Sequence, residues 1–296
     1  EAAGTMTFTL TLSGPSQRSP QVTWTTGDAT ATSPLDYTGG TATVTFGSNV
    51  LTQTVAIPIV DDGIDELDET FGLNLSTPTP SLVTLGSNGT GTITDNDVPV
   101  VSISDPAPVG EAGGPLNFTI SIDQCPATDV TVIGSTGDGS ALSTEDYGSV
   151  SFSVTWFAAG CVAPPGSVTL GVGITDDAIY EPGGNEDFFA NLTSVTPSAV
   201  IDPINNSGLG QIIDNETPPV VNADSPAVAE AAGTMTFTLT LTGAADVPLS
   251  VDWATGDVTA LAGSDYTAGN GTTTFAAYDT SETANVAILD DSTWEP

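Results

Sequence analysis

Apolar and polar residues alternate along most of the chain, which is the pattern of half-buried β-strands. Met6, Phe8 and Leu10 alternate with threonines, and Val55 and Ile57 continue the same period of two further along. Successive side chains of a strand point to opposite faces, so this pattern buries one face and leaves the other in water. Threonine suits that solvated face because its branched side chain favours extended backbone. No amphipathic helix is predicted.

The sequence repeats itself at intervals of about 110 to 119 residues. The twelve residues EAAGTMTFTLTL occur at Glu1 and again at Glu230, and a looser copy, EAGGPLNFTISI, begins at Glu111. Other landmarks recur in step, among them Asp36-Tyr37, Asp146-Tyr147 and Asp265-Tyr266. A period of this length with many short strands favours tandem β-sandwiches over a small-repeat solenoid. We predict domains at 1–97, 98–216 and 217–296.

The second repeat accommodates all the strands of an all-β, seven-stranded, Greek-key or immunoglobulin-like sandwich. The predicted strands are 98–104, 115–122, 130–135, 149–155, 167–174, 187–193 and 208–213, named A to G in order. The first repeat fits this order from strand B onward, and the third fits it as far as strand E. We therefore expect the array to be truncated at both ends. Either the missing strands belong to a longer array, or neighbouring subunits donate them by β-strand complementation.

Charge excludes several functions. The chain has 37 Asp plus Glu, a single Lys or Arg and no His, which gives a formal net charge of −36. Binding to nucleic acid or to anionic lipid requires cations that this chain lacks. Catalysis through histidine is excluded because the chain has no His. No apolar run approaches the ~20 residues of a membrane-spanning helix, so we expect no nucleic acid partner and no membrane insertion.

Strand direction places the recurring acidic residues at one pole of each sandwich. Strands that alternate in direction bring loops AB, CD and EF together with the end of strand G. That pole gathers Glu1, Asp36, Asp61, Asp62, Glu66, Asp95 and Asp97 in the first repeat, Glu111, Asp146, Asp176, Asp177, Glu181, Asp214 and Glu216 in the second, and Glu230, Asp265, Asp290, Asp291 and Glu295 in the third.

Carboxylates gathered in this way need a compensating cation. Two like charges ~4 Å apart repel by about 4 kcal/mol at a surface-like effective dielectric. Ca²⁺ accepts six to eight oxygen ligands in flexible geometry, whereas zinc and copper favour the nitrogen and sulfur ligands that are scarce here. The sequence therefore predicts Ca²⁺ at these poles, and the number of acids favours more than one ion per pole. The alternative is an acidic end that is merely solvated.

These motifs together resemble the Calx-beta domain. The resemblance is carried by Glu1-x-x-Gly4, by Asp36-Tyr37, by Asp61-Asp62-x-x-x-Glu66-x-x-Glu69-x-Phe71 and by the run GTITDND that ends at Asp97. It implies a seven-stranded sandwich with calcium ligands at Glu1, Asp36, Asp61, Asp62, Glu66, Asp95 and Asp97. The second repeat departs from the pattern through Pro182-Gly183-Gly184 and through Glu216 in place of the last Asp, and the third ends before its closing acids.

Cys125 and Cys161 are predicted to lie in loops BC and DE of the second repeat, both at the pole opposite the acids. A disulfide between them is then geometrically reasonable and implies an oxidising compartment. The alternative is two free buried thiols.

We predict a calcium-binding structural or adhesive repeat array of a secreted or cell-surface protein. Ca²⁺ at the inter-domain poles would stiffen a rod, and an extracellular filament is one assembly that such a rod can form. Expected partners are further copies of the chain, other surface proteins or glycans. The alternatives are an ancillary spacer of a large secreted enzyme or adhesin and, third, a calcium-sensing module of a transporter. We expect no catalysis, because the same acids recur in every repeat.

Overall fold

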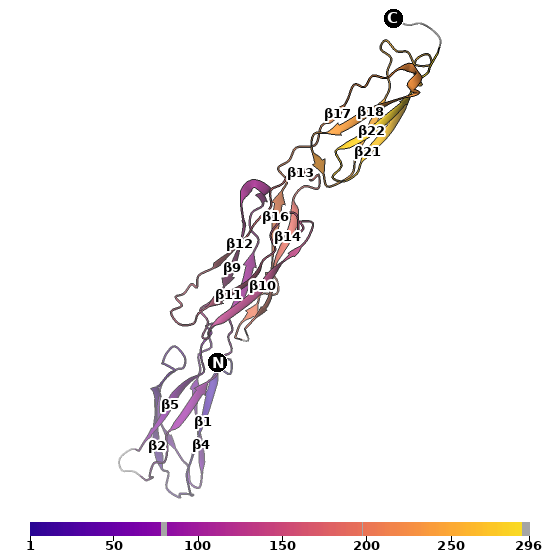
Figure 1. Cartoon of the computed structure of the whole chain (residues 1–296). Helices are drawn as coiled ribbons and strands as arrows, with labels where there is room; N and C mark the ends of the chain where they lie inside the picture. Colours follow the sequence, from indigo (N-terminus) through magenta and orange to yellow (C-terminus); the bar gives the residue numbers. More distant parts are fainter. Residues whose placement is uncertain (78–81, 197, 292–296) are drawn as a thin grey trace.

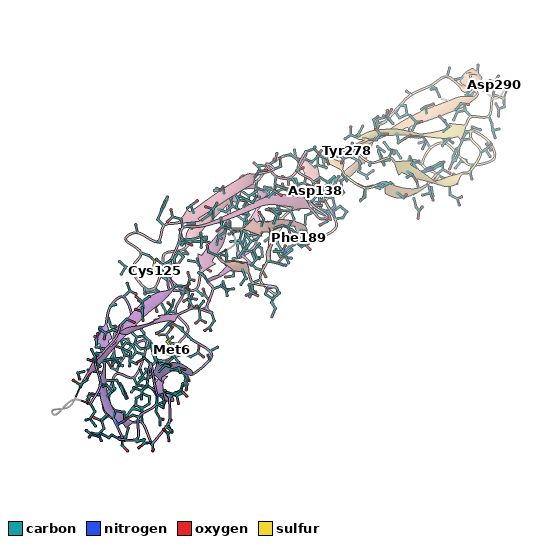
Figure 2. The ribbon with its side chains drawn as sticks, turned by 90° about the horizontal axis from the view of Figure 1, so that it is seen from below. Met6, Cys125, Asp138, Phe189, Tyr278 and Asp290 are labelled. Carbon is teal, nitrogen blue, oxygen red and sulfur yellow. A yellow bond between two sulfur atoms is a disulfide. The ribbon has the colours of Figure 1, made fainter. Side chains whose placement is uncertain are left out.

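The molecule is a row of three β-sandwiches placed end to end (Figures 1 and 2). The computed structural model describes residues 1–77, 82–196 and 198–291. The helical turns in these residues are two short 3₁₀ helices, Glu111–Gly113 and Glu230–Ala232, and no helix among them is long and apolar enough to cross a membrane.

The second repeat has the two complete sheets predicted for it. One sheet orders β12 (Val168–Val172), β9 (Leu116–Ile122), β7 (Val100–Ser104) and the two-residue β15 (Val200–Ile201). The other orders β11 (Ser151–Trp156), β10 (Val130–Asp138), β14 (Glu186–Val195), β16 (Ser207–Ile213) and the two-residue β8 (Val109–Gly110). The seven longer strands are those expected from the alternation. The two-residue strands were not predicted, because two residues carry no readable period.

Stacked aromatic rings fill the core between these sheets. The ring of Phe188 stacks on that of Tyr147 at 4.2 Å between centroids and meets Phe118 edge-on at 5.8 Å. Gly210 lies against the rings, and a Cβ there would come within 2.8 Å of Phe188. The Tyr147 hydroxyl donates a hydrogen bond to Asp138 Oδ1 at 2.6 Å. The core therefore fixes the loop that ends in Asp146, next to Tyr147.

The first and third repeats use the same plan with fewer described strands. In the first, β1 (Thr5–Thr11) pairs with β4 (Thr52–Pro58), opposite a sheet of β3 (Thr41–Thr45), β2 (Gln21–Asp28), β5 (Glu69–Ser76) and β6 (Gly89–Ile93). In the third, β17 (Val221–Ala223), β18 (Thr234–Leu241) and β22 (Ser281–Ala287) face the pair β20 (Leu249–Ala254) and β21 (Asn270–Phe275).

An apolar cavity of about 980 Å³ opens between the sheets of the third repeat. Met235, Phe237 and Trp253 are among the residues that line it. In the second repeat, β14 and β16 extend the sheet beside β10, and their side chains Phe188 and Ile212 belong to the core. The described residues of the third repeat supply no strand at this place.

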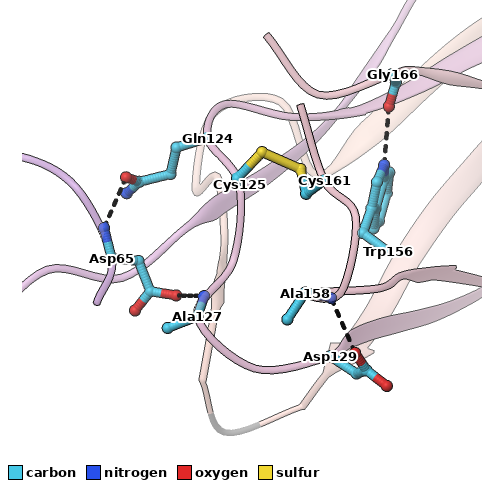
Figure 3. Close-up of a disulfide and its surroundings, with 9 residues drawn as sticks. All are labelled: Asp65, Gln124, Cys125, Ala127, Asp129, Trp156, Ala158, Cys161 and Gly166. Atoms are coloured by element: carbon cyan, nitrogen blue, oxygen red, sulfur yellow. Dashed lines mark hydrogen bonds between the residues drawn. A yellow bond between two sulfur atoms is a disulfide. The ribbon is translucent and has the colours of Figure 1, made fainter. Parts of the chain in front are cut away.

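Each junction brings the EF loop of one repeat against the BC loop of the next. At the first junction, Asp65 N donates to Gln124 Oε1 at 2.9 Å, and Ala127 N donates to Asp65 Oδ2 at 2.6 Å (Figure 3). At the second, β13 (Ile179–Tyr180) pairs in parallel with β19 (Ala244–Ala245). The acidic pole of each preceding repeat therefore lies at the boundary with its neighbour.

A disulfide lies beside the first of these junctions. Cys125 and Cys161 are bonded, with their Cα atoms 5.8 Å apart (Figure 3). The bond ties the BC loop, which also carries Gln124 and Ala127, to the loop after β11. It therefore braces the surface that receives Asp65 of the preceding repeat.

Replacement of the central aromatic ring should destabilise the second repeat. Phe188 is fully buried, so Phe188→Ala should lower the free energy of unfolding by about 3–5 kcal/mol through lost burial and a residual cavity. Urea unfolding measures this change. Phe157→Ala is the control, because Phe157 is 63% exposed and its loss should change stability by no more than about 0.5 kcal/mol. Equal effects of the two substitutions would contradict this description of the core.

Candidate metal centre

Carboxylates gather in two clusters at the acidic pole of each of the first two repeats. In each cluster the ligand oxygens lie within 4.8 Å of one another. The clusters are Glu1, Asp61 and Asp97; Asp36, Glu66 and Glu69; Glu111, Asp214 and Glu216; and Asp146, Glu181 and Glu186. We call them the first outer, first inner, second outer and second inner cluster, in that order.

Backbone hydrogen bonds hold the loops that carry these acids. Asp214 accepts one bond from Glu181 N at 3.1 Å and another from Glu216 N at 2.9 Å, so it ties the EF loop to the end of β16. Asp95 does the same in the first repeat with Glu66 N and Asp97 N, both at 3.2 Å. The Asp-Asn-Asp/Glu run after strand G therefore joins the two clusters of a pole.

The inner clusters are anchored to the core. Asp146 is 8% exposed, and its Oδ2 accepts a bond from Leu142 N at 2.6 Å. Glu186 is the first residue of β14, two positions before the buried ring of Phe188. The core that orders the Tyr147–Phe188 stack therefore also fixes two of the three carboxylates of the second inner cluster.

Buried oxygens without partners concentrate in these clusters. Eight buried side-chain polar atoms among the described residues have no hydrogen-bond partner, and every one is a carboxylate oxygen: Glu1 Oε2, Glu69 Oε2, Asp97 Oδ2, Glu111 Oε2, Glu181 Oε2, Glu186 Oε2, Glu216 Oε2 and Asp246 Oδ1. Each unsatisfied buried group costs about 1–3 kcal/mol, and more when it is charged. Seven of the eight belong to the four clusters, which is the arrangement expected where a cation would satisfy the oxygens.

Burial and mutual repulsion raise the pKa of the carboxyls that have a buried oxygen without a partner. Burial, followed by repulsion from Glu186 and Asp146, raises the pKa of Glu181 to about 8. Burial, followed by repulsion from Asp36, raises the pKa of Glu69 to about 7. Burial, followed by repulsion from Glu216, raises the pKa of Glu111 to about 7 as well. Without a cation, these groups are therefore partly protonated near neutral pH.

A carboxylate of the third repeat adds to this repulsion at the second pole. After burial and Asp146, Asp246 also raises the pKa of Glu186, to about 7. The pKa of Asp246 is itself raised, by burial first and then by Asp214 and Asp146. Asp246 therefore lies within electrostatic range of the second pole although it belongs to the next repeat.

Ten of the predicted metal ligands meet in these clusters, and eight described ones do not. The gathered residues are Glu1, Asp36, Asp61, Glu66, Asp97, Glu111, Asp146, Glu181, Asp214 and Glu216. Outside the clusters lie Asp62, Asp95, Asp176, Asp177, Glu230, Asp265, Asp290 and Asp291. Glu295 lies outside the described residues.

Several of the outlying acids still help to build the poles. Asp62 Oδ1 accepts from Ile64 N at 2.8 Å, and Asp177 Oδ1 accepts from Ile179 N at 2.7 Å, so each shapes an EF loop. Asp265 Oδ2 accepts from Leu261 N at 2.6 Å, as Asp146 does from Leu142. In the third repeat Glu230 is exposed, and the described residues of that repeat form no cluster.

Sequence reasoning missed Glu69, Glu186 and Asp246. Glu69 stood in the quoted motif but not in the predicted ligand set, although its place at the start of β5, three residues after Glu66, was a usable signal. Glu186 is its counterpart, displaced by the longer loop of the second repeat. Asp246 carried no such signal, because nothing in the sequence shows which loop crosses a domain junction.

The donor set fits a hard divalent cation. Every side chain in the four clusters offers carboxylate oxygen and none offers nitrogen or sulfur. Ca²⁺ and Mg²⁺ prefer such ligands, whereas structural zinc sites use cysteine and histidine. The orphaned buried oxygens provide unsatisfied acceptors for the ion.

Comparison with known proteins identifies the class. The Calx-beta domain model matches residues 1–97, 94–216 and 214–296, so the chain belongs to the Calx-beta domain family. The chain is 28% identical over 243 residues to adhesion G-protein coupled receptor V1 of Danio rerio; the match covers 74% of this chain and 4% of that protein. The chain thus corresponds to a small part of this relative's length.

Solved structures of lower similarity were also found. A crystal structure of CBD12 from CALX1.2 is 16% identical, with 71% of this chain and 93% of that chain covered and a TM-score of 0.33. The apo-form Calx CBD1 domain is also 16% identical, with 40% and 99% covered and a TM-score of 0.34.

The raised pKa values predict that the metal-free protein loses stability as pH rises. A carboxyl whose folded pKa exceeds its ordinary 4.5 favours the folded state fully below that value, and the contribution is lost as pH rises through the folded pKa. In chelator, the melting temperature should therefore fall between about pH 5 and pH 8. The Asp carboxyls with lowered pKa, such as Asp138, act below this range.

Thermal melts in EDTA across this range test the prediction. Glu181→Gln should flatten the profile, because Glu181 has the most strongly raised pKa of the cluster carboxyls. Calcium should also flatten it, since the ion binds the ionised form. A melting temperature that rises with pH in chelator would contradict the raised pKa values of these carboxyls.

Proposed function

We propose that this chain is a calcium-binding, non-catalytic repeat array in which Ca²⁺ occupies the acidic poles of the first and second repeats. The observation that carries the proposal is the set of buried carboxylate oxygens without hydrogen-bond partners in all four clusters. The chain has a single Lys or Arg, Arg18, and no His, so its side chains offer almost no positive charge to pair with the twelve acids of the four clusters. A divalent cation supplies the missing positive charge.

Calcium suits the site better than magnesium. Mg²⁺ requires near-ideal octahedral geometry and retains its waters, whereas Ca²⁺ accepts six to eight oxygens, including bidentate carboxylates. Each pole offers two clusters joined through one aspartate, Asp95 or Asp214. This arrangement supports two or more ions per pole.

The position of the poles supports a mechanical role. The EF loop that supplies Glu66 also supplies Asp65, which binds the next repeat; the EF loop with Glu181 likewise includes β13. An ion that fixes the EF loop therefore also fixes the surface on which the following repeat rests. Calcium would stiffen the row of sandwiches into a rod, of the kind found in surface arrays and filaments.

An extracellular or cell-surface location agrees with two observations. The Cys125–Cys161 disulfide is of a kind that persists in oxidising compartments. The curated relative is an adhesion receptor, although the chain matches only 4% of it. We propose that partners are further copies of the chain, other surface proteins or glycans.

Self-association is one way to cover the apolar cavity of about 980 Å³ between the sheets of the third repeat, which β-strands of a neighbouring subunit would bury. A role as a spacer within a larger secreted enzyme or adhesin is the second candidate.

Removal of one cluster carboxylate should weaken calcium binding. Glu69→Gln keeps the size of the side chain and removes one charged oxygen donor, so affinity at the first pole should fall at least roughly tenfold. Isothermal titration with Ca²⁺ measures the change. Asp68→Asn is a matched control, because Asp68 is exposed, adjacent in sequence and outside every cluster. The proposal fails if the folded wild-type chain takes up no Ca²⁺.

Chelation should both destabilise the protein and loosen the rod. At a free Ca²⁺ concentration of about 100 times Kd, binding contributes about 2.7 kcal/mol, so EDTA should lower the melting temperature of a ~100-residue domain by roughly 10–20 °C. Small-angle scattering should show a broader distribution of maximum dimensions in EDTA. Identical scattering profiles with and without calcium would refute the stiffening while leaving calcium binding itself intact.

A further inference from the structure

One orphaned carboxylate lies outside the four clusters. Asp246 Oδ1 is buried without a hydrogen-bond partner, and Asp246 belongs to the third repeat, directly after β19. The other seven orphaned oxygens all belong to acids of the first two repeats. This exception places a carboxylate of the next domain at the pole of the second repeat.

The strand register brings Asp246 beside Glu181. β13 and β19 run in parallel, with Ile179 opposite Ala244 and Tyr180 opposite Ala245. The next residues in this register are Glu181 and Asp246. The backbone continues the pairing, because Asp246 N donates to Tyr180 O at 3.3 Å. After burial and repulsion from Glu186, Asp146 and Glu111, Asp246 also raises the pKa of Glu181, so the two carboxylates lie within electrostatic range of each other.

The third repeat also forms a wall of the space in front of the second inner cluster. A cavity of about 380 Å³ is lined by Asp146, Asp177 and Glu181 of the second repeat and by Tyr278 of the third. Tyr278 N donates to Ala245 O at 2.7 Å, which ties this wall to the loop that carries Asp246. Figure 2 shows Tyr278 at the boundary between the two sandwiches.

An independent observation shows that this pole is built for a ligand. Glu111 is only 6% exposed, yet its Oε2 has no hydrogen-bond partner and its carboxylate meets those of Asp214 and Glu216. Asp214 in turn holds the backbone of Glu181. Asp214 therefore connects the two clusters of this pole, and after burial its charge also raises the pKa of Asp246 across the junction.

The first junction differs in a way that isolates the role of Asp246. Because the second and third repeats align without a gap from Phe118 and Phe237 to Asp138 and Asp257, Asp246 corresponds to Ala127. Ala127 offers no carboxylate, and its N–H donates to Asp65 Oδ2 of the first repeat. The first pole thus has its junction acid in its own EF loop, where the second has Tyr180.

We propose that Asp246 of the third repeat supplies a carboxylate ligand to the divalent cation at the second pole, so that this metal site is completed only when the two repeats are docked. The inference rests on the proposed calcium-binding function. It makes the second junction a metal-bridged contact between domains, while the first pole binds its ions with acids of the first repeat alone.

The test compares Asp246→Asn with Asp252→Asn in the complete chain. Both substitutions remove one negative charge from the third repeat, and Asp252 is an exposed residue of β20 that belongs to no cluster. Isothermal titration with Ca²⁺ should show about tenfold weaker binding at one pole for Asp246→Asn and unchanged binding for Asp252→Asn. If the two variants bind Ca²⁺ equally well, Asp246 is not a ligand.

A second measurement separates a ligand from a residue that merely holds the junction together. In EDTA, Asp246→Asn should leave the melting temperature unchanged or raise it, because it removes an unpaired buried charge. In excess Ca²⁺ the same variant should gain less stability than the wild type. A lower melting temperature in both solutions would assign Asp246 a structural role and overturn the inference.

The outcomes also distinguish this inference from the function on which it rests. If the wild-type chain takes up no Ca²⁺, both proposals fail. If the wild type takes up Ca²⁺ and Asp246→Asn takes it up with the same affinity, calcium binding stands and only the bridging ligand is refuted.

Discussion

The structure depends on negative charge that folding gathers and that the chain itself does not neutralise. The β-sandwich gains its stability from an apolar core, but the strand order that builds this core also brings the AB, CD and EF loops to one end. Acids on these loops approach within 4.8 Å of one another. At such distances repulsion amounts to a few kcal/mol per pair, a large part of the net stability of a domain. The fold can keep its acids only if they are protonated or bind a cation.

The two solutions have opposite functional consequences. Protonation stabilises an isolated domain at low pH, but it brings no new bond between loops. A cation bonds several loops at once, and here those loops also form the contact with the next repeat. In the proposed function, charge compensation at Glu66 or Glu181 therefore becomes a constraint on domain orientation. On that proposal, a neutral chain of the same fold would lack this link between its stiffness and the ionic composition of its surroundings.

Much of the fold and of the acidic poles could be predicted from sequence, because the alternation of side chains and the repeats recur at regular spacing. Alternation of side chains gave the seven longer strands of the second repeat, and the repeated EAAGTMTFTLTL gave the period. Strand direction alone brought Glu111, Asp146 and Glu181 to a common pole. These inferences succeed because they depend on the direction of each strand and not on its exact register.

The details that escaped prediction depend on register and on contacts between domains. The hydrogen bond from Glu181 N to Asp214 depends on the exact conformation of the loop after β16, which the alternation of side chains does not show. The same is true of the division of each pole into two clusters and of the place of Glu69 and Glu186 in them. Asp246 shows the limit most clearly. Its sequence neighbours, Ala245 and Val247, carry no charge and belong to no recurring motif, and its place beside Glu181 exists only because β13 and β19 pair across a junction. A residue of this kind can be assigned from a structure that contains both domains, and an excised second repeat would be expected to lack one of the oxygens that its own pole requires.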